Sequence, residues 1–355
     1  MTHIAPTENQ TISTAADNNA AAASNAAAAA QSVQSAQPAQ PAQSAQLNQF
    51  GGFAQQRFTS LQALHDTERT LVMGVLNITA DSFSDGGLWL DPQKAAQHGA
   101  DMMADGADII DIGAESTRPG AQRVDEDTEK QRVLGAVKAL LPQGAVLSID
   151  TTRASVAQAA LEAGAQIIND VSGGQLDPDM ARVVRDHDCL YIMQHWRGWL
   201  TGSHSGTPDQ DTSHYEHGAL ADVTAEMRRQ LDALVSKGVD ASRIITDPGL
   251  GFSKPKPEHN MPLLAGLDQI KALGCPVLIG QSRKRFINAL LQDLPWRAAA
   301  DDAGHQTDLD NATAALSALC AEHGAWAVRV HDVRRSVAAV RMGSAWRAAA
   351  ADLTR

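Results

Sequence analysis

The sequence has few cysteines and no long hydrophobic run. Its three cysteines, Cys189, Cys275 and Cys320, lie far apart and form no C-x-x-C pair. This spacing argues against a disulfide framework or a zinc knuckle and favours a reducing compartment. No apolar run approaches the roughly 20 residues that a membrane span needs, and no secretory signal pattern opens the chain. We therefore expect a cytoplasmic protein that does not enter a membrane.

The sequence also has fewer basic than acidic side chains. Among its 355 residues, 29 are Lys or Arg and 41 are Asp or Glu, which gives a formal net charge of −12. An acidic chain is a poor candidate for general binding to nucleic acids or anionic membranes, because like charges repel. A local basic site can still bind a small anionic substrate.

Large apolar side chains are scarce near the N-terminus. The stretch from Asn18 to Leu47 consists mostly of Ala, Gln, Ser and Asn. Such a segment cannot bury enough apolar surface to offset the conformational entropy that it would lose on ordering. We therefore predict a disordered low-complexity tail over residues 1–48 and a single folded domain over residues 49–355.

From Leu71 onward, short runs rich in Val, Ile and Leu alternate with Ala-rich stretches. Continuous apolar runs are typical of parallel strands that are buried on both faces. The predicted strands are residues 71–76, 107–112, 145–149, 165–168, 189–193, 243–246, 276–279 and 325–330. The gaps hold predicted helices, among them residues 91–105, 124–141, 155–163, 222–237 and 311–323. Glycines such as Gly106 and Gly164 follow these helices as C-terminal stop signals.

The number of these units decides between two α/β architectures. Eight strand-and-helix units over roughly 270 residues match a (β/α)₈ TIM barrel. The alternative is a doubly wound open sheet, which normally has about five or six strands and a glycine-rich first turn. No G-x-G-x-x-G follows the first apolar run. The sequence therefore predicts a TIM barrel.

Polar residues follow every apolar run, where the active site of a TIM barrel forms. Arg118, Arg329 and His331 suit the oxygens of a phosphate group, because a guanidinium can donate to two oxygens at once. Asn77 and Asp85 offer hard oxygen ligands for a Mg²⁺ ion that keeps several waters and bridges to phosphates. One part of the mouth is therefore predicted to bind a phosphorylated group.

A second set of polar residues suits a flat heterocycle. Asp150, Asn169, Asp247 and Lys284 each follow a different apolar run. Acidic and amide groups can accept hydrogen bonds from ring N–H groups, and a lysine can donate to a ring carbonyl. This set predicts a site for a bicyclic ring with a guanidine-like edge.

Other polar residues have simpler interpretations. Asp108 and Asp111 are interpreted as strand-end or helix-cap residues, and Asp170 fits a loop cap as well as a ligand. The segment 198–218 contains His204, His214 and His217, but its Gly, Ser and Thr content indicates a surface loop rather than a metal site.

Several longer motifs resemble those of the dihydropteroate synthase family. They are residues 73–87 (MGVLNITADSFSDGG), 111–120 (DIGAESTRPG) and 282–284 (SRK), with 148–151, 168–171, 247–252 and 329–333. The resemblance runs in order from about Leu71 to Val333 and leaves the first 48 residues outside.

The resemblance implies a TIM barrel, usually a homodimer, that acts in folate biosynthesis. Its reaction joins 6-hydroxymethyl-7,8-dihydropterin diphosphate to 4-aminobenzoate and releases pyrophosphate. The residues implied to hold the pterin are Asp150, Asn169, Asp247 and Lys284, with Phe252 and Gln194 near the ring. Those implied to bind the diphosphate are Asn77, Thr117, Arg118, Arg329 and His331, with Mg²⁺ nearby. Phe83, Asp85 and Pro119 would belong to mobile loops that close over the second substrate.

Within this set, some residues are expected to act in the chemical step. The expected catalytic residues are Lys284, Arg329, His331, Arg118 and Asp85, and the expected metal ligand is Asn77. One alternative stays open at this point, a divergent paralogue that binds pterin without efficient synthase activity. A pterin-binding barrel of another kind, such as a corrinoid methyltransferase, is disfavoured. It should lack both the SRK motif and the Arg329 and His331 pair, and both are present.

Overall fold

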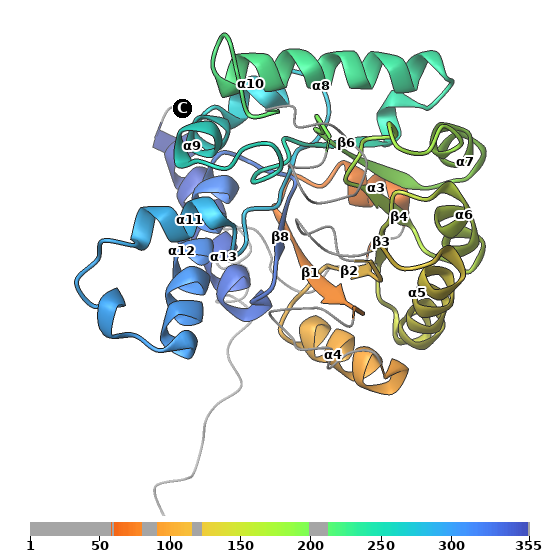
Figure 1. The fold of residues 1–355 in the computed structure, drawn as a ribbon, viewed down its shortest axis with the longest axis horizontal. Coiled ribbons are helices and arrows are strands. Elements are labelled where there is room, and N and C mark those ends of the chain that lie inside the picture. The colour runs from red at the N-terminus through yellow and green to blue at the C-terminus, as the bar shows by residue number, and fades with distance from the viewer. Residues whose placement is uncertain (1–57, 59, 80–90, 116–122, 199–211, 354–355) are drawn as a thin grey trace, which may run out of the picture. The chain divides into compact units, whose positions relative to one another are not determined.

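The computed structural model describes residues 58, 60–79, 91–115, 123–198 and 212–353. Within them, eight parallel strands form a barrel with helices around it (Figure 1). The strands are β1 (Leu71–Asn77), β2 (Ile109–Gly113), β3 (Leu147–Asp150), β4 (Ile167–Asp170), β5 (Leu190–Gln194), β6 (Ile244–Asp247), β7 (Leu278–Ile279) and β8 (Ala327–Val330). Each of the eight predicted strands is present, so the predicted TIM barrel is confirmed. The predicted tail, residues 1–48, lies outside the described residues.

The barrel closes between β6 and β7. Hydrogen-bonded neighbours follow the order β6-β5-β4-β3-β2-β1-β8-β7. The two ends of this order meet through one bridge between Thr246 and Val277, where the Thr246 N–H donates to the Pro276 carbonyl at 2.9 Å. Among the neighbouring strands that the structure describes, β6 and β7 have the fewest paired residues.

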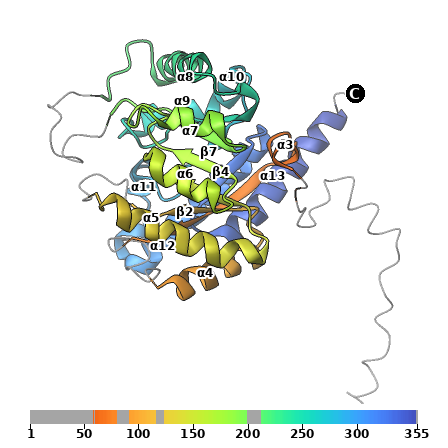
Figure 2. The ribbon, with the colours of Figure 1, turned by 90° about the vertical axis from the view of Figure 1, so that its right-hand side faces the viewer.

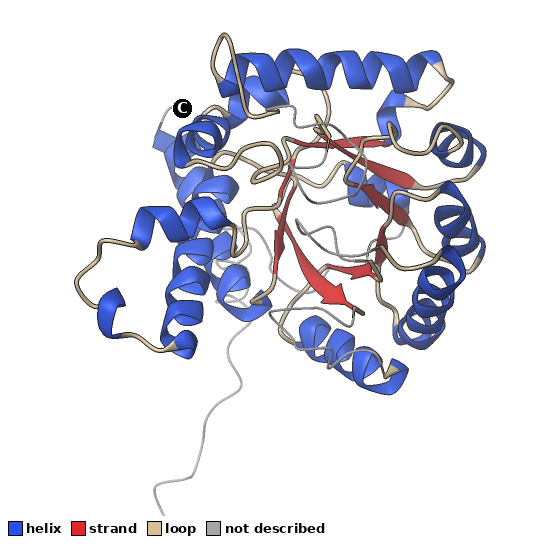
Figure 3. Cartoon of the chain, viewed as in Figure 1, coloured by secondary structure: helices blue, strands red, loops and turns tan. Residues whose placement is uncertain are grey.

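Helices surround the strands in the described part of the chain (Figure 3). They are α3 (Leu61–His65), α4 (Pro92–Ala104), α5 (Glu126–Leu140), α6 (Ala154–Glu162), α7 (Met180–Asp186), α8 (Ala219–Ser236), α9 (Pro257–Ala265), α10 (Leu267–Lys271), α11 (Arg285–Leu291), α12 (Asp302–Glu322) and α13 (Val333–Leu353). The five predicted helices correspond to α4, α5, α6, α8 and α12. None of the described helices is long and apolar enough to cross a membrane.

Local signals explain where these helices begin and end. The Asp91 side chain accepts a hydrogen bond from a backbone N–H of the first turn of α4, and Asp125 does the same for α5. Such caps satisfy N–H groups that have no partner within the helix. Beyond the helix ends, Gly106 and Gly164 have φ angles of 103° and 106°, a region that favours glycine. The predicted stop signals are confirmed.

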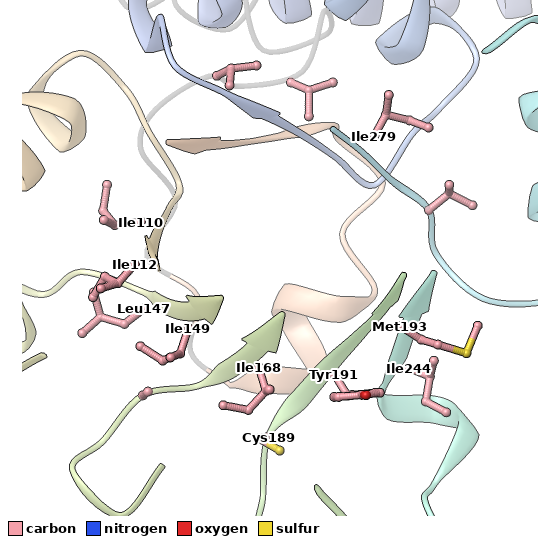
Figure 4. Close-up of a cluster of buried hydrophobic side chains, with 14 of the residues drawn as sticks. Ile110, Ile112, Leu147, Ile149, Ile168, Cys189, Tyr191, Met193, Ile244 and Ile279 are labelled. Carbon is pink, nitrogen blue, oxygen red and sulfur yellow. The ribbon is translucent and has the colours of Figure 1, made fainter. Parts of the chain in front are cut away.

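The pleat of the strands divides the core in two. Alternate side chains point to opposite faces of a strand. Outward residues such as Ile110, Ile112 and Leu147 pack toward the helices (Figure 4). Inward residues such as Ile109 and Ile167 fill the barrel and form a separate apolar cluster. This alternation also decides which polar residues reach the interior.

The end of the barrel where the strands begin is closed by α3 (Figure 2). Leu64 of α3 belongs to the inner apolar cluster, and the indole N–H of Trp326 donates to the Leu64 carbonyl at 3.0 Å. Because α3 fills this end, a polar active site is expected at the opposite end, where the strands finish.

Candidate active site

The inward positions change from apolar to polar as the strands reach this mouth. On β2, Ile109 lies in the inner cluster and Ile112 in the outer cluster, so Asp111 faces inward. At the mouth, the same alternation selects one polar residue on each of seven strands. These residues are Asn77, Asp111, Asp150, Asn169, Gln194, Asp247 and Arg329. Six of these seven were predicted from the sequence, and Asp111 was not.

Arg329 joins two acidic side chains of this ring. Its Nε donates to Asp111 Oδ2 at 2.6 Å, and its Nη2 donates to Asp150 Oδ2 at 2.8 Å. Asn169 Nδ2 also donates to Asp111 Oδ2, at 3.1 Å. Burial raises the pKa of the Asp150 carboxyl, and the charge of Arg329 opposes that rise. The interpretation of Asp111 as a strand-end residue was therefore wrong: it orients Arg329 inside the barrel.

Asp170 points the other way. Its carboxylate accepts hydrogen bonds from the backbone N–H groups of Ser172 and Gly174 and from the Tyr191 hydroxyl. Tyr191 belongs to the outer cluster. Of the two interpretations left open for Asp170, the structure supports the loop cap.

The second half of the mouth contains Asp247. Its carboxylate accepts a hydrogen bond from the Gly249 N–H at 2.7 Å. Burial raises the pKa of Asp247, while this hydrogen bond and the charges of Lys284 and Arg329 oppose the rise. Asp247 therefore lies within electrostatic reach of both the predicted ring-binding lysine and the predicted phosphate-binding arginine. The two predicted halves share one mouth.

Lys284 and Phe252 meet beside Asp247. The Lys284 ammonium lies 4.2 Å from the centre of the Phe252 ring. A Cβ atom built on Gly249 would lie 3.3 Å from Gln194 Cγ, so Gln194 packs against the start of the same turn. Predicted pterin-binding residues from three segments of the sequence are thus close in space.

The backbone before Lys284 has a rare conformation. Arg283 has a φ of 57°, which a residue with a Cβ adopts only when its surroundings hold it there. Its guanidinium pairs with Asp310 of α12 at 2.8 Å. Lys284 follows as the N-cap residue, directly before the first residue of α11. The ion pair therefore stabilises the turn that presents Lys284 to the mouth.

His331 lies at the end of β8, beside the SRK motif. The Ser282 hydroxyl and His331 Nδ1 are 2.9 Å apart. His331 and Arg283 also line a cavity of about 680 Å³, together with His98 and Asp101 of α4. The predicted phosphate-binding histidine is thus oriented by the motif that presents Lys284.

Several predicted residues cannot be placed. Phe83, Asp85, Thr117, Arg118 and Pro119 lie outside the described residues, as do residues 199–211 of the predicted surface loop. Over the described part of the chain, no group of three or more His, Cys, Asp or Glu side chains could hold a metal ion.

The barrel and its mouth define a class, and the comparisons agree with it. Residues 73–331 match the family model described as pterin binding enzyme, so the chain is a pterin-binding enzyme built on a TIM barrel. A dihydropteroate synthase from Mycobacterium leprae is 48% identical over 276 residues, which cover 78% of this chain and 93% of that protein. The chain therefore belongs to the dihydropteroate synthase family.

Solved structures of the same family share the fold. The Xanthomonas albilineans dihydropteroate synthase with 4-aminobenzoic acid has a TM-score of 0.67 at 35% identity and covers 80% of this chain and 94% of its own. The structure of that enzyme in complex with 7,8-dihydropteroate has a TM-score of 0.63 at 30% identity and covers 83% of this chain and 96% of its own.

Proposed function

We propose that this chain condenses 6-hydroxymethyl-7,8-dihydropterin diphosphate with 4-aminobenzoate to give 7,8-dihydropteroate and pyrophosphate. The observation that carries the proposal is the shared mouth, where the proposed pterin-binding and diphosphate-binding residues meet: Arg329 donates to Asp150 at 2.8 Å, and Asn169 and Asp247 point into the same end of the barrel. The relatives that bind 4-aminobenzoic acid and dihydropteroate support the same reaction. They do not favour a pterin-binding paralogue without synthase activity.

The pterin is proposed to lie against β3, β4 and β6. Asp150, Asn169 and Asp247 supply acceptors for the N–H groups of the ring, and Lys284 donates to the ring carbonyl, with Phe252 and Gln194 beside the ring. A site built on hydrogen bonds rejects rings that lack the matching groups, because its own buried polar atoms would then be left unpaired.

The chemical difficulty of this reaction is the departure of pyrophosphate. The aromatic amine is neutral and already carries a free electron pair, so no strong base is needed. Arg329 and His331 are proposed to neutralise the negative charge that builds on the leaving group. The electron-rich pterin stabilises a cationic methylene, which favours a dissociative step. Arg118 is proposed to help neutralise the leaving group, and Asp85 is proposed to help stabilise the cationic methylene. Both residues lie outside the described part of the chain.

The residues at the end of β1 fit a Mg²⁺ ion. A Cβ atom built on Gly113 would lie 3.4 Å from Asn77 Oδ1 and 3.8 Å from Asp150 Oδ2, so both oxygens border the same space beside Gly113. Mg²⁺ prefers oxygen ligands and usually keeps several waters beside substrate phosphates. We propose Asn77 as its protein ligand. When bound there, the ion would neutralise charge on the diphosphate.

A homodimer in the cytoplasm is also proposed. Leu319 of α12 and Met342 and Trp346 of α13 are large apolar side chains that are 58%, 70% and 71% exposed. Gly343 abuts the Ala318 backbone where these helices cross, so the three side chains belong to one surface. Exposed apolar patches mark association sites.

The proposed cytoplasmic location has separate support. The three cysteines are free and buried, which suits a reducing compartment.

The test is complementation of a folate-auxotrophic strain that lacks its own synthase, together with pyrophosphate release by the purified chain. Growth and a pyrophosphate signal that requires both substrates would support the proposal. Binding of the pterin diphosphate without turnover would instead favour the paralogue.

A further inference from the structure

A lysine that the sequence motifs did not single out is fully buried behind the pterin-binding turn. Lys254 is 0% exposed, and its ammonium has three partners. Its Nζ lies 3.0 Å from the Gly249 carbonyl, 3.0 Å from the Phe252 carbonyl and 2.9 Å from His195 Nδ1. An ammonium has three N–H donors and no acceptor. The site therefore satisfies each donor once.

The protonation of His195 follows from this contact. Nδ1 must accept from Lys254, so the proton of the neutral ring lies on Nε2 and is donated to Glu226 Oε2 at 2.8 Å. Glu226 is held in turn by two hydrogen bonds from Arg197, at 2.6 and 2.7 Å. A hydrogen-bonded chain thus runs from α8 through β5 to the back of the turn after β6.

The front of that turn forms the proposed pterin site. The Gly249 N–H donates to the Asp247 carboxylate at 2.7 Å, and the Phe252 ring lies under the Lys284 ammonium. Gly251 has a φ of 78°, and a Cβ atom built on it would lie 3.0 Å from Lys284 Cδ. On one side, the turn contacts Asp247 and Lys284 and presents the Phe252 ring. On the other side, it contacts the Lys254 ammonium.

We propose that Lys254 is a positioning residue for pterin binding. By holding the Gly249 and Phe252 carbonyls from behind, it fixes the spacing at which Asp247 and Lys284 meet the ring. The inference rests on the proposed function and adds to it a residue that itself does not touch substrate.

The turn also has support that does not depend on the Lys254 side chain. Asn260 of α9 accepts a hydrogen bond from the Gly251 N–H at 2.8 Å and donates to the Lys254 backbone carbonyl at 2.8 Å. These contacts remain when the Lys254 side chain is replaced. A substitution of Lys254 should therefore shift the turn without unfolding it.

The first experiment compares Lys254→Met with Thr70→Val. The Thr70 hydroxyl is buried at the opposite end of the barrel and donates to the Ala325 carbonyl at 2.7 Å, so its loss is a matched control for a lost buried hydrogen bond. Calorimetry measures the Kd of the pterin diphosphate without 4-aminobenzoate, and steady-state kinetics measure the KM for each substrate.

For Lys254→Met, the Kd and KM for the pterin diphosphate should rise about tenfold or more, because small misplacements of positioned groups are costly. The KM for the amine substrate should stay within about twofold. For Thr70→Val, all three constants should match those of the wild type. An unchanged pterin Kd in Lys254→Met, or equal rises in both KM values, would overturn the proposal.

A second pair keeps the test decisive if Lys254→Met does not fold. His195→Asn retains an acceptor near the position of Nδ1, whereas His195→Leu removes it. The Asn variant should keep the pterin Kd within about threefold of the wild type, and the Leu variant should lose about tenfold. Equal losses in both variants would overturn the role of Lys254. A wild-type chain that binds pterin without forming dihydropteroate would contradict the proposed function alone.

Discussion

Arg329 and Asp111 form an ion pair across a strand that lies between them. They belong to β8 and β2, which both pair with β1, and their Nε and Oδ2 atoms are 2.6 Å apart. Asp150 of β3 extends the contact by a further strand. The guanidinium is thereby held in place before any substrate arrives, which is the preorganisation that charge stabilisation in catalysis requires.

The first prediction concerns this pair. Arg329→Gln leaves Asp111 and Asp150 close together in a buried site without a positive partner. We expect turnover to fall by at least about 10²-fold and the free energy of unfolding to fall by about 3–5 kcal/mol. Steady-state kinetics and urea denaturation measure both quantities. Arg182→Gln is the control, because Arg182 pairs with Asp179 on the surface. A stable, active Arg329→Gln variant would refute the role of this residue.

The second prediction concerns Lys284. Lys284→Ala removes the proposed donor to the ring carbonyl, so pterin affinity and turnover should each fall on the order of 10²-fold. Pterin binding by calorimetry and initial rates check this. Lys271→Ala, which changes a lysine of α10 that contacts Asp268 at 3.4 Å, should behave as the wild type. Unchanged kinetics in Lys284→Ala would remove this residue from the site.

The third prediction is a dependence of stability on pH. Burial lowers the pKa of His195 to about 3, below its ordinary value of 6.5. Between these values the unfolded chain binds a proton that the folded chain does not. Stability should therefore fall as the pH falls from 6.5 toward 3, with His195 contributing up to about 1.4 kcal/mol per pH unit.

Urea denaturation from about pH 5 to about pH 7.5 measures this contribution. His195→Asn should flatten the slope, whereas His217→Gln, a change at an exposed histidine, should keep it. Equal slopes in the wild type and His195→Asn would show that the ring is not held neutral.

The fourth prediction concerns the predicted tail. The match to the pterin-binding family begins at residue 73, and none of the predicted site residues precedes Asn77. Deletion of residues 1–48 should therefore leave kcat/KM within about twofold of the full chain. A loss of activity well beyond that range would assign the tail a role in the reaction.

The fifth prediction concerns association. Trp346→Glu places a charge in the apolar surface of α12 and α13 and should convert a dimer to a monomer at micromolar concentration, measured by sedimentation. Trp296→Glu is the control, because Trp296 is 60% exposed but lies outside both helices. A wild-type chain that is already monomeric, or a Trp346→Glu variant that stays dimeric, would contradict the proposed interface.

The sequence predicted the barrel because strand count and helix stop signals are local properties. It also predicted Asp150, Asn169 and Asp247, because these residues end apolar runs. Asp111 was missed since its partner, Arg329, is 218 positions away and the two meet only when the barrel closes. The alternation from Ile109 could have indicated that Asp111 faces inward, but it could not name the partner.

Lys254 was missed for a different reason. A lysine in a loop is ordinarily solvated, and three hydrogen bonds are needed to bury one. Two of its acceptors are backbone carbonyls, which carry no signal in the sequence, and the third is the ring of His195. Only the path of the chain after β6 brings them together.

The single backbone bridge between β6 and β7 separates Asp247 from the segment that leads to Lys284. A pterin held by both residues would span this seam and add hydrogen bonds where the sheet has fewest. Bound substrate would then stabilise the part of the barrel that has the fewest backbone hydrogen bonds. Pterin binding should therefore slow amide hydrogen exchange in β6 and β7 more than in the other strands of the sheet.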